Sequence, residues 1–486
     1  MRRVFCFFWS FWCLLLSLHA QHEWPKPEGI LISPTEQADF SRDLLPKVVW
    51  QMPRIVTAAP KATLFAVYGK GDLRWRDHVA LLATLQERFA AQELRIAVVV
   101  AKGEAKLLCE SKPPFAVGEL AVPLADYEPM WLDCGEPLLI PLPLDVAADV
   151  FAAVAAGQPV GELLTASEDL EDMLSNVGDG ISAFGLFDTS DAASLAAVLS
   201  CLEKLPHSGR AHALRVLMSY WCRADLPAAR QYAMDSVRDL AEQPWALIEF
   251  SDLVLRCDKD NVEIGKQLAF HLAHIAAAAP DSMAAQLVYL RALLRTGQDQ
   301  IAGRMLSRLA KLVANSTEAN LWFAETLMEA AEATPYREFA EQALAAAAKL
   351  SADPRLLFAA RYKVLVQCGA KPAESAALMA AARKALGEGS AMWLNDDAWY
   401  LMTSIATMGR FDSYALAQCE ELSRLAGDHL SNEQSDTLAL AMFLNRRVQA
   451  AIDLQTEVVA ASQQDPDYVL RLRRYQQTLS LRAKKK

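Results

Sequence analysis

The apolar residues follow two different periods along this chain. From about residue 167 to the C-terminus they recur every three or four positions, in segments separated by short breaks, which predicts a series of amphipathic helices. Before residue 160 there are instead continuous apolar runs, KATLFAVY (61–68) and LRIAVVVA (94–101), which predict buried strands. The change of period predicts a mixed α/β region followed by an all-helical region.

The first region predicts a strand–helix–strand unit. Val79, Leu82, Leu85 and Phe89 form one helical stripe between the two apolar runs, so we expect parallel strands joined by a right-handed crossover. A short helix is expected over 104–109. PMWLDCGEPLLI (129–140) predicts two strands around a tight turn at 134–135, and a helix follows over 146–156.

The breaks in the helical region are regularly spaced. We expect the turn inside each helical pair near one of seven residues, which lie 36, 37, 36, 36, 40 and 37 positions apart: Ala224, Asp260, Gly297, Ala333, Gly369, Gly409 and Arg446. A near-constant step of this size is typical of a solenoid of helical hairpins. Counting back another step reaches Asp188, so an eighth, irregular hairpin is expected to lead the array.

Small residues recur about five positions after these turns, where two antiparallel helices must approach closely: Ala193, Ala229, Gly265, Ala302 and Ala451. Large residues at helical spacing, such as Leu287, Leu290, Leu293, Leu306 and Leu309, are expected to fill the core between the helices.

The stretch VYLRALLRTGQDQIAGRMLSRLAKLV resembles a tetratricopeptide repeat, with Gly297 at the helix–helix turn and Ala302 at the small crossing position. The units around Leu401-Met402 and Leu438-Ala439 resemble divergent members of the same family. We therefore expect residues 161–188 to form a linker with an irregular first helix, and residues 189–486 to form a tetratricopeptide-like superhelix with a C-terminal capping helix.

The resemblance implies a binding surface. The family binds peptide segments or partner helices on the face lined by the first helix of each hairpin, and this face would be apolar and aromatic here. The alternative is that superhelical winding or docking of the N-terminal domain buries the same residues. The expected partner groove contains Met218, Trp221, Phe250, Arg291, Leu294, Phe323 and Trp399.

Residues 57–160 resemble a thioredoxin-like domain. In that family the turn after the first buried strand carries Trp-Cys-x-x-Cys at a helix N-terminus, which lowers the pKa of the reactive thiol. Neither cysteine is present here, so the resemblance implies a domain without the usual redox activity. The corresponding turn instead contains Lys70, Asp72, Arg74, Trp75 and Arg76. It suits a structural or binding role, with Asp72 a candidate helix cap and anion capture a weaker alternative.

The family's cis-proline would correspond to Pro129, which follows Glu128, or alternatively to Pro123.

The N-terminal end has the pattern of a secretory signal. Arg2 and Arg3 precede an apolar run, and Ala20 stands at a plausible cleavage point, so residues 1–20 predict a signal peptide. We expect an exported, periplasmic or extracellular protein, with an uncleaved membrane anchor as the alternative. Residues 21–56 form a proline-containing arm with one edge strand expected near 48–50. The net charge of −11 argues against nucleic acid as a partner.

Candidate chemistry is sparse. The seven cysteines beyond the signal peptide are scattered, and Cys109 with Cys134 is a conceivable single bridge. His271 and His274 share a helix face without a carboxylate at matching spacing, so a surface pair is favoured over a metal site. No phosphate-binding loop or nucleophile motif is present, and no cofactor is expected.

These patterns predict an exported, non-catalytic scaffold or adaptor that binds a protein or peptide partner. The competing hypothesis is a thiol-disulfide oxidoreductase, or a descendant that still binds cysteine-bearing clients, using non-standard cysteines. A strongly depressed thiol pKa would separate the two.

Overall fold

The structure is a computed structural model, and it describes thirteen stretches of the chain. These are residues 47–52, 60–68, 74–110, 112–120, 130–133, 140–142, 144–179, 192–221, 226–257, 262–386, 391–404, 406–427 and 429–483. The predicted signal peptide, most of the arm and the predicted leading turn at Asp188 lie outside them. No helix in these stretches is long and apolar enough to cross a membrane.

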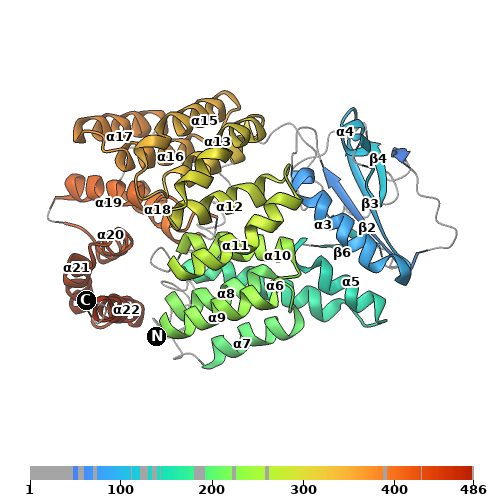
Figure 1. The fold of residues 1–486 in the computed structure, drawn as a ribbon. Coiled ribbons are helices and arrows are strands. Elements are labelled where there is room, and N and C mark those ends of the chain that lie inside the picture. The colour runs from blue at the N-terminus through green and yellow to red at the C-terminus, as the bar shows by residue number, and fades with distance from the viewer. Residues whose placement is uncertain are drawn as a thin grey trace. The chain divides into compact units, whose positions relative to one another are not determined.

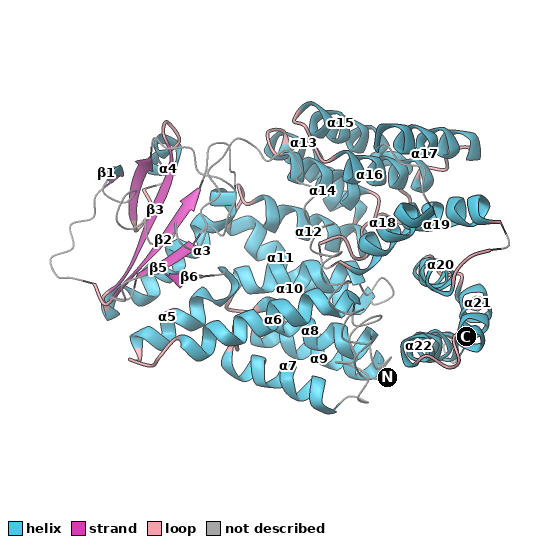
Figure 2. Ribbon diagram, turned by 180° about the vertical axis from the view of Figure 1, so that it is seen from behind, coloured by secondary structure: helices cyan, strands magenta, loops and turns pink. Residues whose placement is uncertain are grey.

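The chain divides into two compact units. One holds the residues up to Asp72 together with Gln86–Leu142, and the other holds Leu73–Leu85 together with Pro143–Lys486. The first part of helix α3 (Arg74–Phe89) therefore belongs to the helical unit, as does α5 (Ala147–Ala155). The strands occur in the first unit among the described residues, and the second is helical (Figure 2).

The first unit is built on a mixed sheet with the strand order β1-β4-β3-β2-β5-β6. The strands are β1 (Val49–Met52), β2 (Ala62–Tyr68), β3 (Leu94–Ala101), β4 (Ala116–Leu120), β5 (Met130–Asp133) and β6 (Ile140–Pro141). The central strands β2, β3 and β4 are parallel, while β1, β5 and β6 are antiparallel to their neighbours. The short helix α4 (Ala105–Glu110) lies between β3 and β4 in the chain.

The predicted strand–helix–strand unit is present. Ala62 pairs with Leu94 and Tyr68 with Val100 in one parallel ladder. Leu64, Val98 and Val99 are fully buried, which explains why both strands are continuous apolar runs. The second expected pair is also present, since β5 and β6 are antiparallel.

Strand β4 was not predicted. Its sequence AVGEL contains a glycine and follows two prolines, so its local pattern does not mark a strand. The glycine has a packing reason: a Cβ on Gly118 would lie 2.3 Å from Cγ1 of Val48, in the segment that leads into β1. Strand β1 itself lies at the sheet edge, near the edge strand expected at residues 48–50.

The second unit consists of helices in chain order (Figure 1). After α5 they are α6 (Gly161–Asp179), α7 (Ala192–Lys204), α8 (Gly209–Trp221), α9 (Leu226–Asp239), α10 (Pro244–Cys257), α11 (Val262–Ala278), α12 (Met283–Arg295), α13 (Asp299–Val313), α14 (Thr317–Leu327), α15 (Arg337–Lys349), α16 (Pro354–Gln367), α17 (Pro372–Leu386), α18 (Ala391–Thr403), α19 (Asp412–Ala426), α20 (Asn432–Leu444), α21 (Val448–Ala461) and α22 (Pro466–Ala483).

Within the described residues, α8 to α21 form seven consecutive pairs, and all seven predicted turn residues fall between the two helices of a pair. Gly297, Gly369, Gly409 and Arg446 have positive φ angles of 67° to 76° there. This left-handed conformation ends a helix and reverses the chain, and glycine adopts it at the lowest cost. The turn signals read from the sequence are therefore backbone requirements.

Side-chain caps start several of the first helices. Ser282, Ser316 and Ser431 accept hydrogen bonds from the first-turn amides of α12, α14 and α20, and Asp353 does so for α16. Such caps satisfy amides that have no partner inside the helix. The predicted small crossing residues are buried as expected, at Ala229, Ala302 and Ala451.

The basic C-terminal segment forms the predicted capping helix, α22, which packs against α21. Its side chains are less solvated than expected. Arg471 and Tyr475 are almost completely buried, because Arg471 pairs with Asp436 of α20 and the Tyr475 ring stacks on Phe443.

Candidate functional site

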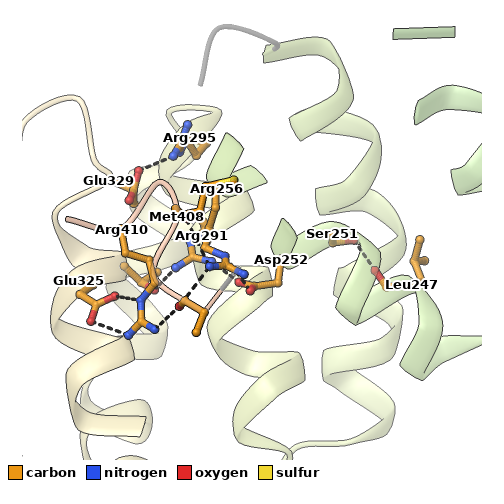
Figure 3. A network of polar contacts seen from close by, with 12 residues as sticks. Leu247, Ser251, Asp252, Arg256, Arg291, Arg295, Glu325, Glu329, Met408 and Arg410 are labelled. Atoms are coloured by element: carbon orange, nitrogen blue, oxygen red, sulfur yellow. Dashed lines mark hydrogen bonds and ion pairs between the residues drawn. The ribbon is translucent and has the colours of Figure 1, made fainter. Parts of the chain in front are cut away.

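Charged side chains form a chain of contacts along the first helices of four successive pairs. We call this set the charge ladder; its members are Asp252, Arg256, Arg291, Arg295, Glu325, Glu329 and Lys363. They lie in α10, α12, α14 and α16, except Glu329, which follows the end of α14, and Figure 3 shows most of them from close by. Arg291 is 1% exposed and Glu325 is also 1% exposed, so the ladder runs through the interior of the helical unit.

The ladder repeats with the hairpins. The Arg291 guanidinium contacts the carboxylate of Asp252, 39 residues earlier, and Arg295 binds Glu329, 34 residues later, at 2.5 Å. Lys363 then donates to Glu329 at 2.7 Å, again across 34 residues. Asp252 and Arg291 thus pair opposite charges between neighbouring first helices, and so do Arg295 and Glu329, which satisfies these buried charges between repeats.

The turn between α18 and α19 closes over the ladder. Arg410 donates two hydrogen bonds to Glu325, from Nε at 2.7 Å and Nη2 at 2.8 Å, across 85 residues. Arg256 donates from Nη1 to the carbonyl oxygens of Ala406 at 3.4 Å and Met408 at 3.3 Å. We call residues 406–411 the ladder turn.

The backbone of the ladder turn also approaches α10 closely. Gly409 has a φ of +76°, and a Cβ at this position would lie 2.5 Å from the carbonyl oxygen of Arg256. Met408 and Phe411, on either side, are buried. The contact therefore needs glycine for two reasons, its conformation and its lack of a side chain.

The electrostatics of the site keep its charges ionised. Burial alone would raise the pKa of Asp252, but Arg256, Arg291 and Arg410 outweigh burial and lower it. Burial likewise opposes the charge of Arg410, and Glu325 and Asp252 more than restore it, so its pKa is raised. The site is a set of paired buried charges that can bind or hold a charged group.

Five of the seven residues predicted for the partner groove are buried: Met218, Phe250, Arg291, Leu294 and Phe323. Trp399 is partly exposed, and the side chain of Trp221 lies outside the described residues. The alternative of burial by superhelical packing is therefore the one observed for these five side chains. Arg291 is the one residue of the predicted groove that also belongs to the charge ladder.

Sequence reasoning missed the rest of the ladder. A signal was present, because Asp252 and Arg291, and likewise Arg295, Glu329 and Lys363, recur at about the repeat spacing with alternating charge. Comparing charges at equivalent positions of successive repeats would have found it. The contribution of Arg410 could not be found this way, because its contact with Glu325 joins residues 85 positions apart that do not occupy equivalent positions in the repeats.

The predicted thioredoxin turn is only partly described. Lys70, Asp72 and Pro129 lie outside the described residues, as does the side chain of Arg74. Arg76 lies over the ring of Trp75 at 5.4 Å. The predicted cap at Asp72 therefore stays a prediction, while Asp77 contacts another helix: it accepts hydrogen bonds from Ser282 Oγ at 2.9 Å and from the Ala284 amide at 3.0 Å. This carboxylate caps α12, and burial raises its pKa to about 6.

The described cysteines have weakly acidic thiols. Burial raises the pKa of Cys109, Cys201, Cys368 and Cys419. Cys134 lies outside the described residues, so the conceivable bridge with Cys109 stays a prediction. His274 binds the Phe270 carbonyl on its own helix, and the described residues contain no group of His, Cys, Asp and Glu side chains that could hold a metal ion.

Comparison with known proteins gives little. No family model matches the chain, and no curated protein matches it significantly. Among solved structures, the chain is similar to the tetratricopeptide domain of P58(IPK), at 15% identity over 64% of this chain and 99% of that one, with a TM-score of 0.16. A TM-score this low does not establish a shared fold, so the description of the repeats rests on their own helices, turns and contacts.

Proposed function

We propose that this protein is an exported, non-catalytic scaffold that binds a protein partner through its array of helical hairpins. The observation that carries the proposal is the run of seven helical pairs between α8 and α21 of the described chain. In such arrays each pair packs mainly against its neighbours and the array presents an extended surface, which suits the binding of other proteins.

The exposed apolar side chains indicate where a partner would bind. Met392 is 63% exposed and Tyr400 45% exposed on α18, about two helical turns apart. Val366 of α16 is 40% exposed. These residues replace the buried groove residues as the candidate surface for an amphipathic partner.

The partner surface is tested by site-specific photo-crosslinking in the cell of origin. We expect crosslinking groups at Met392 and Tyr400 to give one common adduct. A group at Phe270 of α11, which is 64% exposed, is the matched control and is expected not to give that adduct. Equal labelling at all three sites, or none at Met392 and Tyr400, would contradict this surface.

We also propose that the first unit is a thioredoxin-like domain without redox activity. The order β6-β5-β2-β3, with a parallel central pair and an antiparallel hairpin, supports this assignment. The parallel strand β4 and the antiparallel strand β1 extend the sheet beyond that core. The raised thiol pKa of Cys109 supports the absence of redox activity, because the thiolate is the reactive species.

The oxidoreductase hypothesis is tested by insulin reduction with dithiothreitol, using protein that lacks residues 1–20. We expect no turnover above background, and the same result for a variant with Cys109→Ser and Cys134→Ser. Turnover that disappears in the variant would replace the scaffold proposal with a non-standard oxidoreductase.

A further inference from the structure

We propose that the ladder turn is an intramolecular ligand of the charge ladder, and that displacing it opens a site for an arginine-bearing segment of a partner protein. The site is the surface of α10, α12 and α14 that residues 406–411 now cover. The contacts of the turn show which chemistry this surface recognises. The proposal deepens the scaffold function by naming a second, gated contact and the kind of segment that fits it.

The first requirement of the site is a guanidinium. Glu325 has a side chain with no exposed surface, and Arg410 meets it with the two-pronged geometry that suits carboxylates. If the ladder turn leaves, Glu325 keeps a buried charge without this partner, which is unfavourable until another cation replaces it. An arginine satisfies both carboxylate oxygens at once, which a lysine ammonium does not.

The second requirement is a pair of backbone carbonyls. Arg256 donates to the carbonyl oxygens of Ala406 and Met408, just ahead of Arg410. Arg410 also donates from Nη1 to the Ala406 carbonyl at 2.7 Å, so the turn folds around its own arginine. The segment that fits is therefore a compact turn with an arginine at its end and a glycine before it.

The helical packing changes where the ladder turn inserts. The first helices contact one another in order from α8 to α16, but α16 then packs against α19. Eight residues separate α18 from α19 and nine separate α14 from α15, whereas three separate α12 from α13 and three separate α20 from α21. This hairpin therefore has the extra chain length needed to reach α10, which lies 150 residues earlier.

A substitution at Gly409 is expected to displace the ladder turn, and a substitution at Gly369 is its matched control. Gly409→Ala introduces a Cβ against the Arg256 carbonyl, whereas Gly369→Ala, at a φ of +70°, places its Cβ in open space. Both substitutions carry a similar backbone cost, because both glycines have a positive φ. A difference in behaviour between the two variants therefore reports on the contact between the ladder turn and α10.

The first readout is limited trypsin digestion of the full chain at the Arg410 bond. We expect cleavage in Gly409→Ala to be at least about tenfold faster than in wild type, and Gly369→Ala to stay within about twofold. Equal cleavage in the two variants would overturn the claim that the turn is a releasable ligand. If Gly409→Ala fails to fold, Arg410→Ala with hydrogen exchange at residues 406–411 tests the same release, and unchanged exchange there would overturn it.

The second readout is binding of a labelled peptide with the sequence of residues 402–413. We expect Gly409→Ala to bind it at least about tenfold more tightly than wild type, and Glu325→Gln in that background to abolish the gain. The same peptide with Arg410→Gln is expected not to bind. A released turn without peptide binding would overturn the recognition site. That result would leave crosslinking at Met392 and Tyr400 unaffected, so it is distinguishable from failure of the scaffold proposal.

Discussion

Asp252 in the charge ladder and Asp436 under the capping helix are both mostly buried aspartates paired with arginine, yet their pKa values shift in opposite directions. Three arginines surround Asp252 and overcome burial, which lowers its pKa. Asp436 has the single cation Arg471, at 2.6 Å, and burial outweighs it, so the pKa is raised. The number of cations near the carboxylate, more than burial itself, decides the direction of the pKa shift.

The largest effect is expected from Asp252→Asn. This change leaves Arg256 and Arg291 without their carboxylate in the ladder, and removing one member of a buried ion pair costs about 3–5 kcal/mol. Urea unfolding at pH 7 measures the loss. A loss below about 1 kcal/mol would show that the ladder contributes little and would remove the basis of the comparison.

Asp77 extends the comparison to a carboxylate held by hydrogen bonds, for which Arg76 lowers the pKa less than those hydrogen bonds do. Its folded pKa of about 6 lies above the ordinary aspartate value of 3.8, so its favourable contribution is complete below pH 3.8 and is lost as the pH rises through 6. Asp77→Asn keeps an acceptor for Ser282 and Ala284, and we expect it to raise stability at pH 7 by about 1–2 kcal/mol. Unfolding at pH 4.5 and pH 7 checks this, since the gain should shrink at the lower pH.

The smallest effect is expected from Asp436→Asn, at about 1 kcal/mol, because burial already disfavours the charged form of this carboxylate and the neutral amide oxygen still accepts from Arg471. The sign of its pH dependence sharpens the comparison. Because the pKa of Asp436 is raised, the wild type should gain stability over this variant as the pH falls from 7 toward 4. For Asp252, whose pKa is lowered, the wild type keeps its advantage until the pH falls below the ordinary aspartate value of 3.8. Parallel pH profiles for the two variants would contradict the opposite shifts.

Local pattern predicted much of the architecture because the relevant interactions are close in sequence. The turn residues Gly297 and Gly369 end helices through their own φ angles, and β2 and β3 are apolar because both faces are covered. Strand β4 was not predicted because its own sequence is a short segment that contains a glycine. It is a strand because it pairs with β3, and local pattern does not reveal that pairing. The groove residue Phe250 was predicted to line a surface and is buried, since apolar periodicity marks a buried face without saying what covers it.

The sequence alone determined the helical pairs, their spacing and the parallel strand pair, because hydrophobic period and turn chemistry act over a few residues. Tertiary structure decided the site. Arg410 reaches Glu325 across 85 residues and Arg256 reaches Met408 across 152. Residues so far apart in sequence come into contact only through the packing of many helices. The lowered pKa of Asp252 likewise depends on arginines from three separate segments of the chain.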